Sequence, residues 1–419
     1  MFLGPLPSFA YALFLSLFMP GTNLILGVIV GGLLTLPLLF NYYYVSRKLP
    51  KFAGNYVYIS RQLGGFFGVL FAMSQIVTLG ISQAVLANLE TDLVIEPILK
   101  LFDLHISFIL IISIIVLGFG YLLSLSRRSV QIMMALQLAG TIATIFAIFQ
   151  MKPSVNIITN SFSLSNTIAF AIILMLTLYL FIDAPIYYGS EIRNSNKAFK
   201  VGYFGSFLAT ILILIIISLA GELPANLVTF YTNNIIILYV IILGALTWYI
   251  GYLIVNIRNS SRLIFALAFD NILPERFTKL KKNVPVYAYG LLFLIAMAFL
   301  LIENYLNLSL SFVLDGVLFL IWNYMLFALS SIFGKEKDKK IRITAILTMI
   351  SLIFTFIYSI YVLSLPKVGE ILTSGNIFFD IFVVIIPPIL AIIIYIISKL
   401  RNRKKGIDLN IIFREIPPD

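Results

Sequence analysis

A carboxylate inside a long apolar run is the residue of this sequence with the clearest chemical potential. Residues 172–182 are almost entirely apolar, and Asp183, Ala184 and Pro185 follow them directly. Placing a charged side chain at the centre of a bilayer costs roughly 2.5–3.5 kcal/mol on insertion scales, so an intramembrane acid usually serves a function. Pro185 removes a backbone donor and disfavours helix at Ala184. The pattern predicts an unwound point where a cation, a substrate ammonium group or a proton binds. The alternative is a snorkelling or helix-capping acid beside a simple kink.

Three further polar features of the sequence can be interpreted in functional or in structural terms. Arg262 and Asp270 are eight residues apart, about two turns on one helix face, which predicts either an inner gate or the cytoplasmic end of a helix with a surface turn. Asp315 is a second possible intramembrane acid, but it stands only seven residues from the start of its apolar run and can reach the outer interface. Asn323 lies deeper, where an amide can join two helices.

Several classes of chemistry are excluded by composition. The chain has no cysteine and one histidine, His105, which excludes disulfides, thiolate chemistry and cysteine-based zinc or iron–sulfur sites. It has no glycine-rich phosphate loop with a lysine, so we expect no ATPase motor. No Ser/His or His/Glu pair is available within an apolar run, which argues against an intramembrane enzyme. We therefore predict a protein that is not an enzyme and needs no cofactor.

Long apolar segments must position these residues. Of the 419 residues, 61% are apolar and 11% are charged, against roughly 25% charged in soluble proteins. The mean hydropathy is +1.04, which indicates an all-α polytopic membrane protein. Most of the apolar runs have about 20 residues, the length needed to cross a bilayer. We predict spans at residues 3–19, 22–45, 64–88, 105–125, 130–150, 165–189, 200–220, 234–257, 285–302, 308–333, 343–364 and 377–398.

The positive charges are sorted to one side of these spans. When the loops are assigned alternately to two sides, 26 of the 29 lysines and arginines fall on the side of loop 46–63. By the positive-inside rule this side is cytoplasmic, and so is the C-terminus. The acids Glu90, Asp92, Glu96 and Glu303 are predicted in outer loops. The net charge of +11 is then explained by membrane topology rather than by a nucleic acid partner, and we expect a multi-pass protein of the cell membrane.

The first apolar run is short. From Pro7 to Met19 there are 13 residues, about 20 Å of helix, which is nearer half a bilayer than a whole one. The run has neither the positive n-region nor the cleavage site of a signal peptide. We therefore expect a truncated first span and, in all, 11–12 transmembrane helices.

Four motifs in order along the chain resemble those of the amino acid–polyamine–organocation permeases. The first is Pro50-x-x-Gly54-x-Tyr56-x-Tyr58-x-Ser60-Arg61-x-x-Gly64, which by physics alone is a cytoplasmic loop with aromatic interfacial anchors. The second runs from Asp183 to Glu191-Ile-Arg-Asn194, and the third is Arg262-x-x-x-Ala266-x-Ala268-x-Asp270-x-x-Leu273-Pro274. The fourth, Gly406-Ile-Asp-Leu409 through Glu415-Ile-Pro-Pro418, is similar to the tail of archaeal members.

The resemblance implies a leucine-transporter-like inverted-repeat fold. One transporter domain, residues 1–419, would comprise a truncated five-plus-five core at 3–333, two additional helices at 334–399 and a cytoplasmic tail at 400–419. The protein would move amino acids or related amines by alternating access, driven by a proton or sodium gradient or by exchange. The implied substrate-binding residues are Asp183, Phe181, Ile182, Ala184, Pro185 and Gly4, and the implied gating or structural residues are Arg262, Asp270, Glu191, Gly54 and Tyr56.

The sequence departs from the family at three places. Asn55 replaces a glycine, Phe181 stands where a small glycine is common, and the Gly-x-Gly break of the first helix is missing. These departures leave a second hypothesis open, a protein on the same helices that does not transport, such as a sensor or a decayed paralogue. A respiratory proton-pumping subunit is disfavoured, because the predicted spans contain no lysine beyond Lys200, the first residue of its span.

Overall fold

A computed structural model of the chain describes residues 15–16, 18–100, 103, 108–150, 162–192, 194–219, 235–281, 284–306, 312–335, 337–372 and 377–414. Within these residues, nine helices are long and apolar enough to cross a membrane, and the shorter apolar helices Ile109–Ser124 and Leu320–Phe333 accompany them. They coincide with the eleven spans predicted from residue 22 onward, so the all-α polytopic class is confirmed. Most of the predicted span 3–19, with Gly4, lies outside the described residues, as does His105.

The described helices follow one another along the chain. Their bounds are α2 (Leu24–Lys48), α3 (Gly54–Gln62), α4 (Gly65–Glu90), η1 (Thr91–Ile95), α5 (Glu96–Lys100), α6 (Ile109–Ser124), α7 (Arg127–Gln150), α8 (Leu164–Thr177), η2 (Tyr179–Tyr187), η3 (Gly189–Glu191), α9 (Ser195–Lys200), η4 (Val201–Gly205), α10 (Ser206–Leu219), α11 (Ile235–Ala245), α12 (Trp248–Phe269), η6 (Glu275–Thr278), α13 (Val286–Leu306), α14 (Phe312–Phe333), α15 (Lys339–Ser364), α16 (Pro366–Leu372), α17 (Ile377–Lys404) and α18 (Leu409–Ile412).

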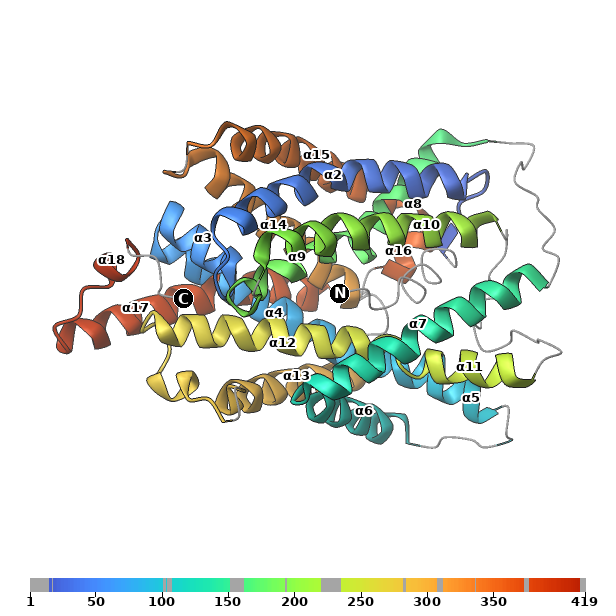
Figure 1. The fold of residues 1–419 in the computed structure, drawn as a ribbon, viewed down its shortest axis with the longest axis horizontal. Coiled ribbons are helices and arrows are strands. Elements are labelled where there is room, and N and C mark those ends of the chain that lie inside the picture. The colour runs from blue at the N-terminus through green and yellow to red at the C-terminus, as the bar shows by residue number, and fades with distance from the viewer. Residues whose placement is uncertain are drawn as a thin grey trace.

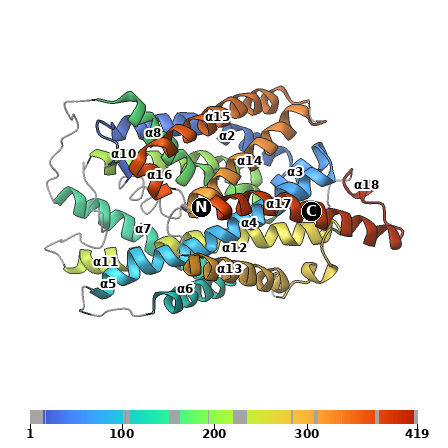
Figure 2. The ribbon, with the colours of Figure 1, turned by 180° about the vertical axis from the view of Figure 1, so that it is seen from behind.

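Helix α4 is the central element of the bundle. It contacts α12, α14, α13, α17 and α3, and its apolar window is the most buried of the membrane helices described. Figure 1 shows α3, α18 and the end of α17 at one end of the bundle, with α5 and α11 at the other. The view from behind shows α4 between the layer of α2, α14 and α15 and the layer of α6 and α13 (Figure 2).

The predicted span 234–257 differs from the observed helices in two ways. The helix is interrupted at Leu246 and Thr247, and it then continues as α12 to Phe269. Arg258 and Arg262 therefore lie on α12, the helix expected to leave the membrane while still carrying Arg262. The interruption was not predicted, because its sequence, Ala245-Leu-Thr-Trp248, contains neither glycine nor proline.

Two acids expected in outer loops are buried instead. Glu90 is 0% exposed, and its Oε2 accepts a hydrogen bond of 3.1 Å from the backbone N–H of Tyr249, at the first turn of α12. The carboxylate therefore receives one of the N–H groups that the helix start leaves unsatisfied. Glu303, in α13, is 5% exposed. The prediction failed because α4 runs to Glu90 and α13 to Leu306, so each helix extends past the predicted end of its span and includes the acid.

The tyrosine-rich stretch after Pro50 is also not an interfacial anchor. Residues Gly54–Gln62 form helix α3, and Tyr56 and Tyr58 are buried in the protein. The helix packs on α4 and α14, so its aromatic rings lie in the core of the bundle rather than among lipid headgroups. Helix α3 also contacts η2, α12 and the C-terminal tail, the elements that carry the other three motifs.

Candidate functional site

The sixth predicted span is not a regular α-helix. Helix α8 ends at Thr177, and residues Tyr179–Tyr187 form the 3-10 helix η2, which contains Asp183 and Pro185. A 3-10 run of this length is uncommon and often marks a functional hinge. The prediction that the helix geometry breaks around Asp183 is therefore confirmed, although the break begins several residues before the proline.

Asp183 lies in the interior of the protein. Its side chain is buried, with 4% exposure, and it interacts with the hydroxyl-bearing side chains of Tyr324 and Tyr187. Its Oδ2 atom has no hydrogen-bond partner among the described residues. No lysine or arginine in the described part of the chain forms an ion pair with it. The carboxylate therefore has tyrosine neighbours but no counter-charge, and a buried charge of this kind is costly unless a cation or a proton reaches it.

Four buried tyrosines, which we call the tyrosine ring, interact electrostatically with the acid. Tyr42, Tyr187, Tyr203 and Tyr324 are each 1% exposed or less. They come from four different elements, α2, η2, η4 and α14. The aromatic faces are themselves packed, since Tyr42 meets the edge of Tyr324 at a centroid distance of 5.8 Å. Tyr187 and Tyr324 are the two whose hydroxyl groups interact directly with the acid.

An amide pair joins the helices beside this ring. Asn323 Nδ2 donates to Gln75 Oε1 at 2.7 Å and connects α14 to α4. Gln75 also contacts Tyr187, one of the tyrosines around Asp183. The predicted role of Asn323 in helix packing is therefore confirmed, and its Oδ1 atom remains without a partner among the described residues.

The other residues predicted to bind substrate are only partly described. Ile182 and Ala184 are half-buried and Pro185 is buried, so all three line or support the same 3-10 segment. The side chains of Phe181 and Asp315 lie outside the described residues, as does the whole of Gly4. Their proposed contacts with substrate remain predictions.

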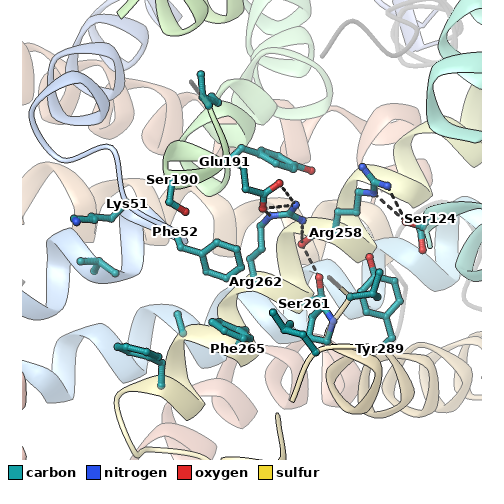
Figure 3. Close-up of a pocket in the computed structure, with 18 of the residues that line it drawn as sticks. Lys51, Phe52, Ser124, Ser190, Glu191, Arg258, Ser261, Arg262, Phe265 and Tyr289 are labelled. Atoms are coloured by element: carbon teal, nitrogen blue, oxygen red, sulfur yellow. Dashed lines mark hydrogen bonds and ion pairs between the residues drawn. The ribbon is translucent and has the colours of Figure 1, made fainter. Parts of the chain in front are cut away.

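A cavity of about 940 Å³ opens beyond the end of η2. Its lining includes residues of α12, of the η2–η3 segment, of the α6–α7 connection and of the loop before α3, as Figure 3 shows. Tyr188 lines the cavity and follows Asp183 by five residues, which is about 10 Å of 3-10 helix. We call this cavity the vestibule. It lies at the end of the bundle that carries α3, the end predicted to be cytoplasmic.

One bidentate ion pair forms the wall of the vestibule. Arg262 donates from Nε and Nη2 to the two oxygens of Glu191 at 2.8 and 2.9 Å (Figure 3). Its guanidinium lies 4.0 Å from the ring centroid of Tyr188, which precedes η3. The pair joins α12 to the end of the broken sixth span, and it is partly solvated, with side-chain exposures of 12% and 45%.

A second bidentate ion pair is more completely buried than the first. Arg61 donates to Asp270 at 2.6 and 2.8 Å, and the hydroxyl of Tyr56 donates to the same carboxylate at 2.7 Å. The side chains of this pair are only 7% and 3% exposed. We call Arg61, Asp270 and Tyr56 the inner triad. The spacing of Arg262 and Asp270 suggested that they act together. Instead they make two separate contacts, Arg262 with Glu191 and Asp270 with Arg61.

The loop before α3 fits closely against the end of η2. Gly189 has no room for a side chain, because a Cβ atom there would lie 2.6 Å from the carbonyl carbon of Pro50. Ala53 N–H donates to the carbonyl of Tyr187, and a Cβ on Gly54 would contact Ile186. These contacts pack the loop before α3 against the segment that carries Asp183, which is not among the residues that line the vestibule.

Sequence reasoning missed Arg61, Tyr187, Tyr324 and the role of Tyr42. Arg61 was present in the first motif but has no spacing relation to Asp270, which is 209 residues away. The tyrosines could have been found only as the polar members of otherwise apolar spans. In the described residues, no group of three His, Cys, Asp or Glu side chains is arranged to hold a metal ion.

Comparison with known proteins supports the fold and leaves the family open. No family model matches the chain. A protein named "Uncharacterized protein 399", of Sulfolobus islandicus rod-shaped virus 1, is 29% identical over 402 residues, which cover 95% of this chain and 92% of that protein. The similarity thus extends over nearly the whole of both chains.

Solved structures with the same fold include two mutant forms of the manganese transporter of Eremococcus coleocola. Their crystal structures match this chain with a TM-score of 0.57, at 13% and 12% sequence identity, and the match covers 94% of this chain and 91% of theirs. The protein therefore has the fold of a membrane transporter over almost its full length. The amino acid–polyamine–organocation family specifically is not established by these comparisons.

Proposed function

We propose that the protein is a secondary transporter that moves a cationic or zwitterionic amine, an amino acid or a related amine, across the membrane by alternating access. The observation that carries the proposal is Asp183, a buried carboxylate with an unpartnered oxygen and no basic neighbour among the described residues. Such a group is tolerated within a membrane protein where a cavity or a cation receives it. The transporter fold of the structural neighbours supports the same conclusion.

The surroundings of Asp183 favour an organic ammonium group over a metal ion. Divalent cations such as Mn²⁺ bind to several carboxylate, carbonyl or water oxygens, whereas Asp183 is a single carboxylate among phenol side chains. Aromatic faces attract ammonium groups through cation–π interactions, worth about 2 kcal/mol or more when desolvated. Asp183 therefore supplies the counter-charge and the tyrosine ring supplies an aromatic wall, which together suit an amine better than a hydrated ion.

The vestibule supplies the inner route in this proposal. Its wall pair, Arg262 and Glu191, links α12 to the segment that carries Asp183, and the inner triad holds α3 against α12. Separation of these contacts would connect the acid to the vestibule. The coupling ion would be a proton or sodium, since either can neutralise Asp183 when the substrate is absent; exchange of two substrates would do so without an ion.

Uptake into vesicles tests the proposal. The purified protein is reconstituted, and accumulation of radiolabelled leucine, arginine and putrescine is measured beside that of radioactive manganese, with an imposed proton or sodium gradient. We expect accumulation of at least one amine and its competition by unlabelled amine. Accumulation of manganese alone would replace the amine by a metal substrate. Absence of uptake of every probe, with intact folded protein, would favour the second hypothesis, a sensor or decayed paralogue.

The membrane orientation is part of the same proposal. We propose that the end bearing α3, the vestibule and the C-terminal tail faces the cytoplasm, because the basic residues are concentrated on that side of the spans. A reporter enzyme fused after Asp419 should be active only in the cytoplasm. External activity of the fusion would reverse the orientation and make the vestibule an entrance.

A further inference from the structure

The C-terminal tail folds back onto the inner triad. Helix α17 ends at Lys404, and Gly406 turns the chain with a positive φ of 73°. The short helix α18 and Phe413 follow, and the side chains of Leu409 and Phe413 are buried, with 5% and 6% exposure. A basic tail after the last span would ordinarily be solvated, so this burial requires a specific docking surface.

Phe413 docks on the arginine of the inner triad. Its ring lies 5.7 Å from the guanidinium carbon of Arg61, within the range of a cation–π contact. The ring also occupies the space left by the missing side chain of Gly65, the first residue of α4, because a Cβ atom at Gly65 would overlap it. The tail thus covers the junction of α3 and α4, where the side chain of Arg61 extends from α3 to Asp270.

A second anchor holds the turn that follows Asp270. Asn402 Nδ2 donates to the carbonyl of Asn271 at 2.8 Å, and Arg401 donates to the carbonyls of Asn271 and Leu273. Asn271 itself has a positive φ of 58°, so this turn has a defined shape that the two side chains fix from outside. The donors stand at the end of α17, one turn before the chain reverses.

We propose that residues 401–413 form a latch that holds the inner gate shut. Both partners of the buried pair are held by the same segment, Arg61 through Phe413 and Asp270 through the carbonyls that follow it. Helices α3 and α12 therefore cannot separate at the triad without breaking a tail contact. Release of the tail lowers the cost of opening the gate. The inference rests on the proposed transport function for the statement that the gate opens, but its contacts do not depend on any substrate.

The absence of cysteine from the chain provides a direct test. Val57 is 3% exposed, belongs to α3 between Tyr56 and Arg61, and lines the vestibule, so a Val57→Cys reporter reacts with a maleimide only when α3 moves. In this background Phe413→Ala is compared with Ile411→Ala, which truncates a 55% exposed side chain of the same tail. We expect the rate of labelling in vesicles to rise about fivefold or more with Phe413→Ala, the lower range of a typical coupling between sites, and to stay unchanged with Ile411→Ala.

A second variant reaches the same contact from the other side. Gly65→Ala leaves the tail sequence intact but adds a methyl group where the ring of Phe413 lies, so it should displace the tail and raise labelling in the same direction. Complete labelling of every variant in denaturant and monodisperse size-exclusion profiles establish that the proteins are comparable. Unchanged labelling rates in both Phe413→Ala and Gly65→Ala, or an equal rise with Ile411→Ala, would overturn the latch.

The same experiment separates the latch from the proposed function. If labelling rises in the two variants while no amine is taken up by any form of the protein, the latch stands and the transport proposal fails. If amines are taken up while labelling does not respond to the tail variants, transport stands and the latch fails.

Discussion

Two aspartates of this protein are both buried beside tyrosines, but only one of them has a positively charged partner among the described residues. Asp183 and Asp270 are 4% and 2% exposed, and each interacts with tyrosine hydroxyl groups. Asp270 is also held by two hydrogen bonds from Arg61, whereas Asp183 has one oxygen without a partner and no basic neighbour among the described residues. The comparison indicates that the fold satisfies the charge of Asp270, whereas Asp183 has no counter-charge among the described residues, as the proposed binding of a cation or proton requires.

The positions of the two acids in the fold agree with this division. Asp270 is the C-cap residue of α12, a regular helix of 22 residues, and it joins that helix to α3. Asp183 lies in a 3-10 segment between four tyrosine-bearing elements. A fixed contact between regular helices suits a gate, and a carboxylate on an irregular segment suits a binding site.

The largest expected effect is on uptake. Asp183→Asn should reduce amine uptake on the order of 100-fold or more, because removing one partner of a buried charge pair costs 2–5 kcal/mol. The variant should fold and insert normally, since the asparagine removes an unpaired charge. Wild-type uptake with wild-type pH dependence in reconstituted Asp183→Asn protein would sink the assignment of the binding site.

The two acids should also differ in their contribution to stability. Asp270→Asn leaves Arg61 buried without its counter-ion, and breaking such a pair costs roughly 3–5 kcal/mol in free energy of unfolding. Asp183→Asn should change the same quantity by less than about 1 kcal/mol, within the range of substitutions that break no network. Reversible unfolding of both variants in mixed detergent measures the difference. Equal destabilisation by the two substitutions would remove the distinction between a structural and a binding aspartate.

A smaller effect is expected at the vestibule wall. Arg262→Ala removes the contact with Glu191 and Tyr188, and it should shift the balance between inward-open and outward-open states by about 1–3 kcal/mol, the usual size of a coupling between sites. Substrate affinity should change modestly, and Glu191→Gln should shift the balance in the same direction. If Arg262→Ala leaves both the transport rate and cytoplasmic accessibility unchanged, the pair is an ordinary surface contact.

The smallest effect concerns a single hydroxyl group of the tyrosine ring. Tyr324→Phe keeps the aromatic wall and removes one hydrogen-bonding group near Asp183, so amine affinity should fall about three- to tenfold, the equivalent of 0.5–1.5 kcal/mol for one hydrogen bond. Tyr358→Phe, at a tyrosine whose hydroxyl contacts the carbonyl of Ser165 near the exposed surface, is the matched control. Equal affinity losses in the two variants would argue against a specific role for Tyr324.

The sequence alone predicted the membrane class and the order of the spans, because apolar length and the sorting of basic residues are strong local signals. It also predicted the interruption at Asp183, since an acid and a proline within an apolar run are both unfavourable in a regular helix. The break at Leu246 and Thr247 was missed because neither residue is a glycine or proline, and Glu90, whose carboxylate accepts a hydrogen bond from the first turn of α12, belongs to another helix. Local sequence cannot show such a partner.

The pairing of the gate residues could not be predicted for the same reason. Arg262 and Asp270 share a helix, and their spacing suggested one functional unit, but their partners Glu191 and Arg61 are 71 and 209 residues away. The tyrosine ring around Asp183 is likewise assembled from four elements that are distant in the chain. Packing of the helices, rather than any single motif, determines which polar groups meet.

The central claim is that the positive charge of the substrate meets Asp183. A cryo-electron microscopy structure of the reconstituted protein with an amine that it accumulates tests this most directly. The account predicts the ammonium nitrogen within hydrogen-bonding distance of the Asp183 carboxylate, about 2.7–3.2 Å, and enclosed by Tyr42, Tyr187 and Tyr324. An amine bound elsewhere in the bundle, or an Asp183 carboxylate that faces lipid, would contradict it.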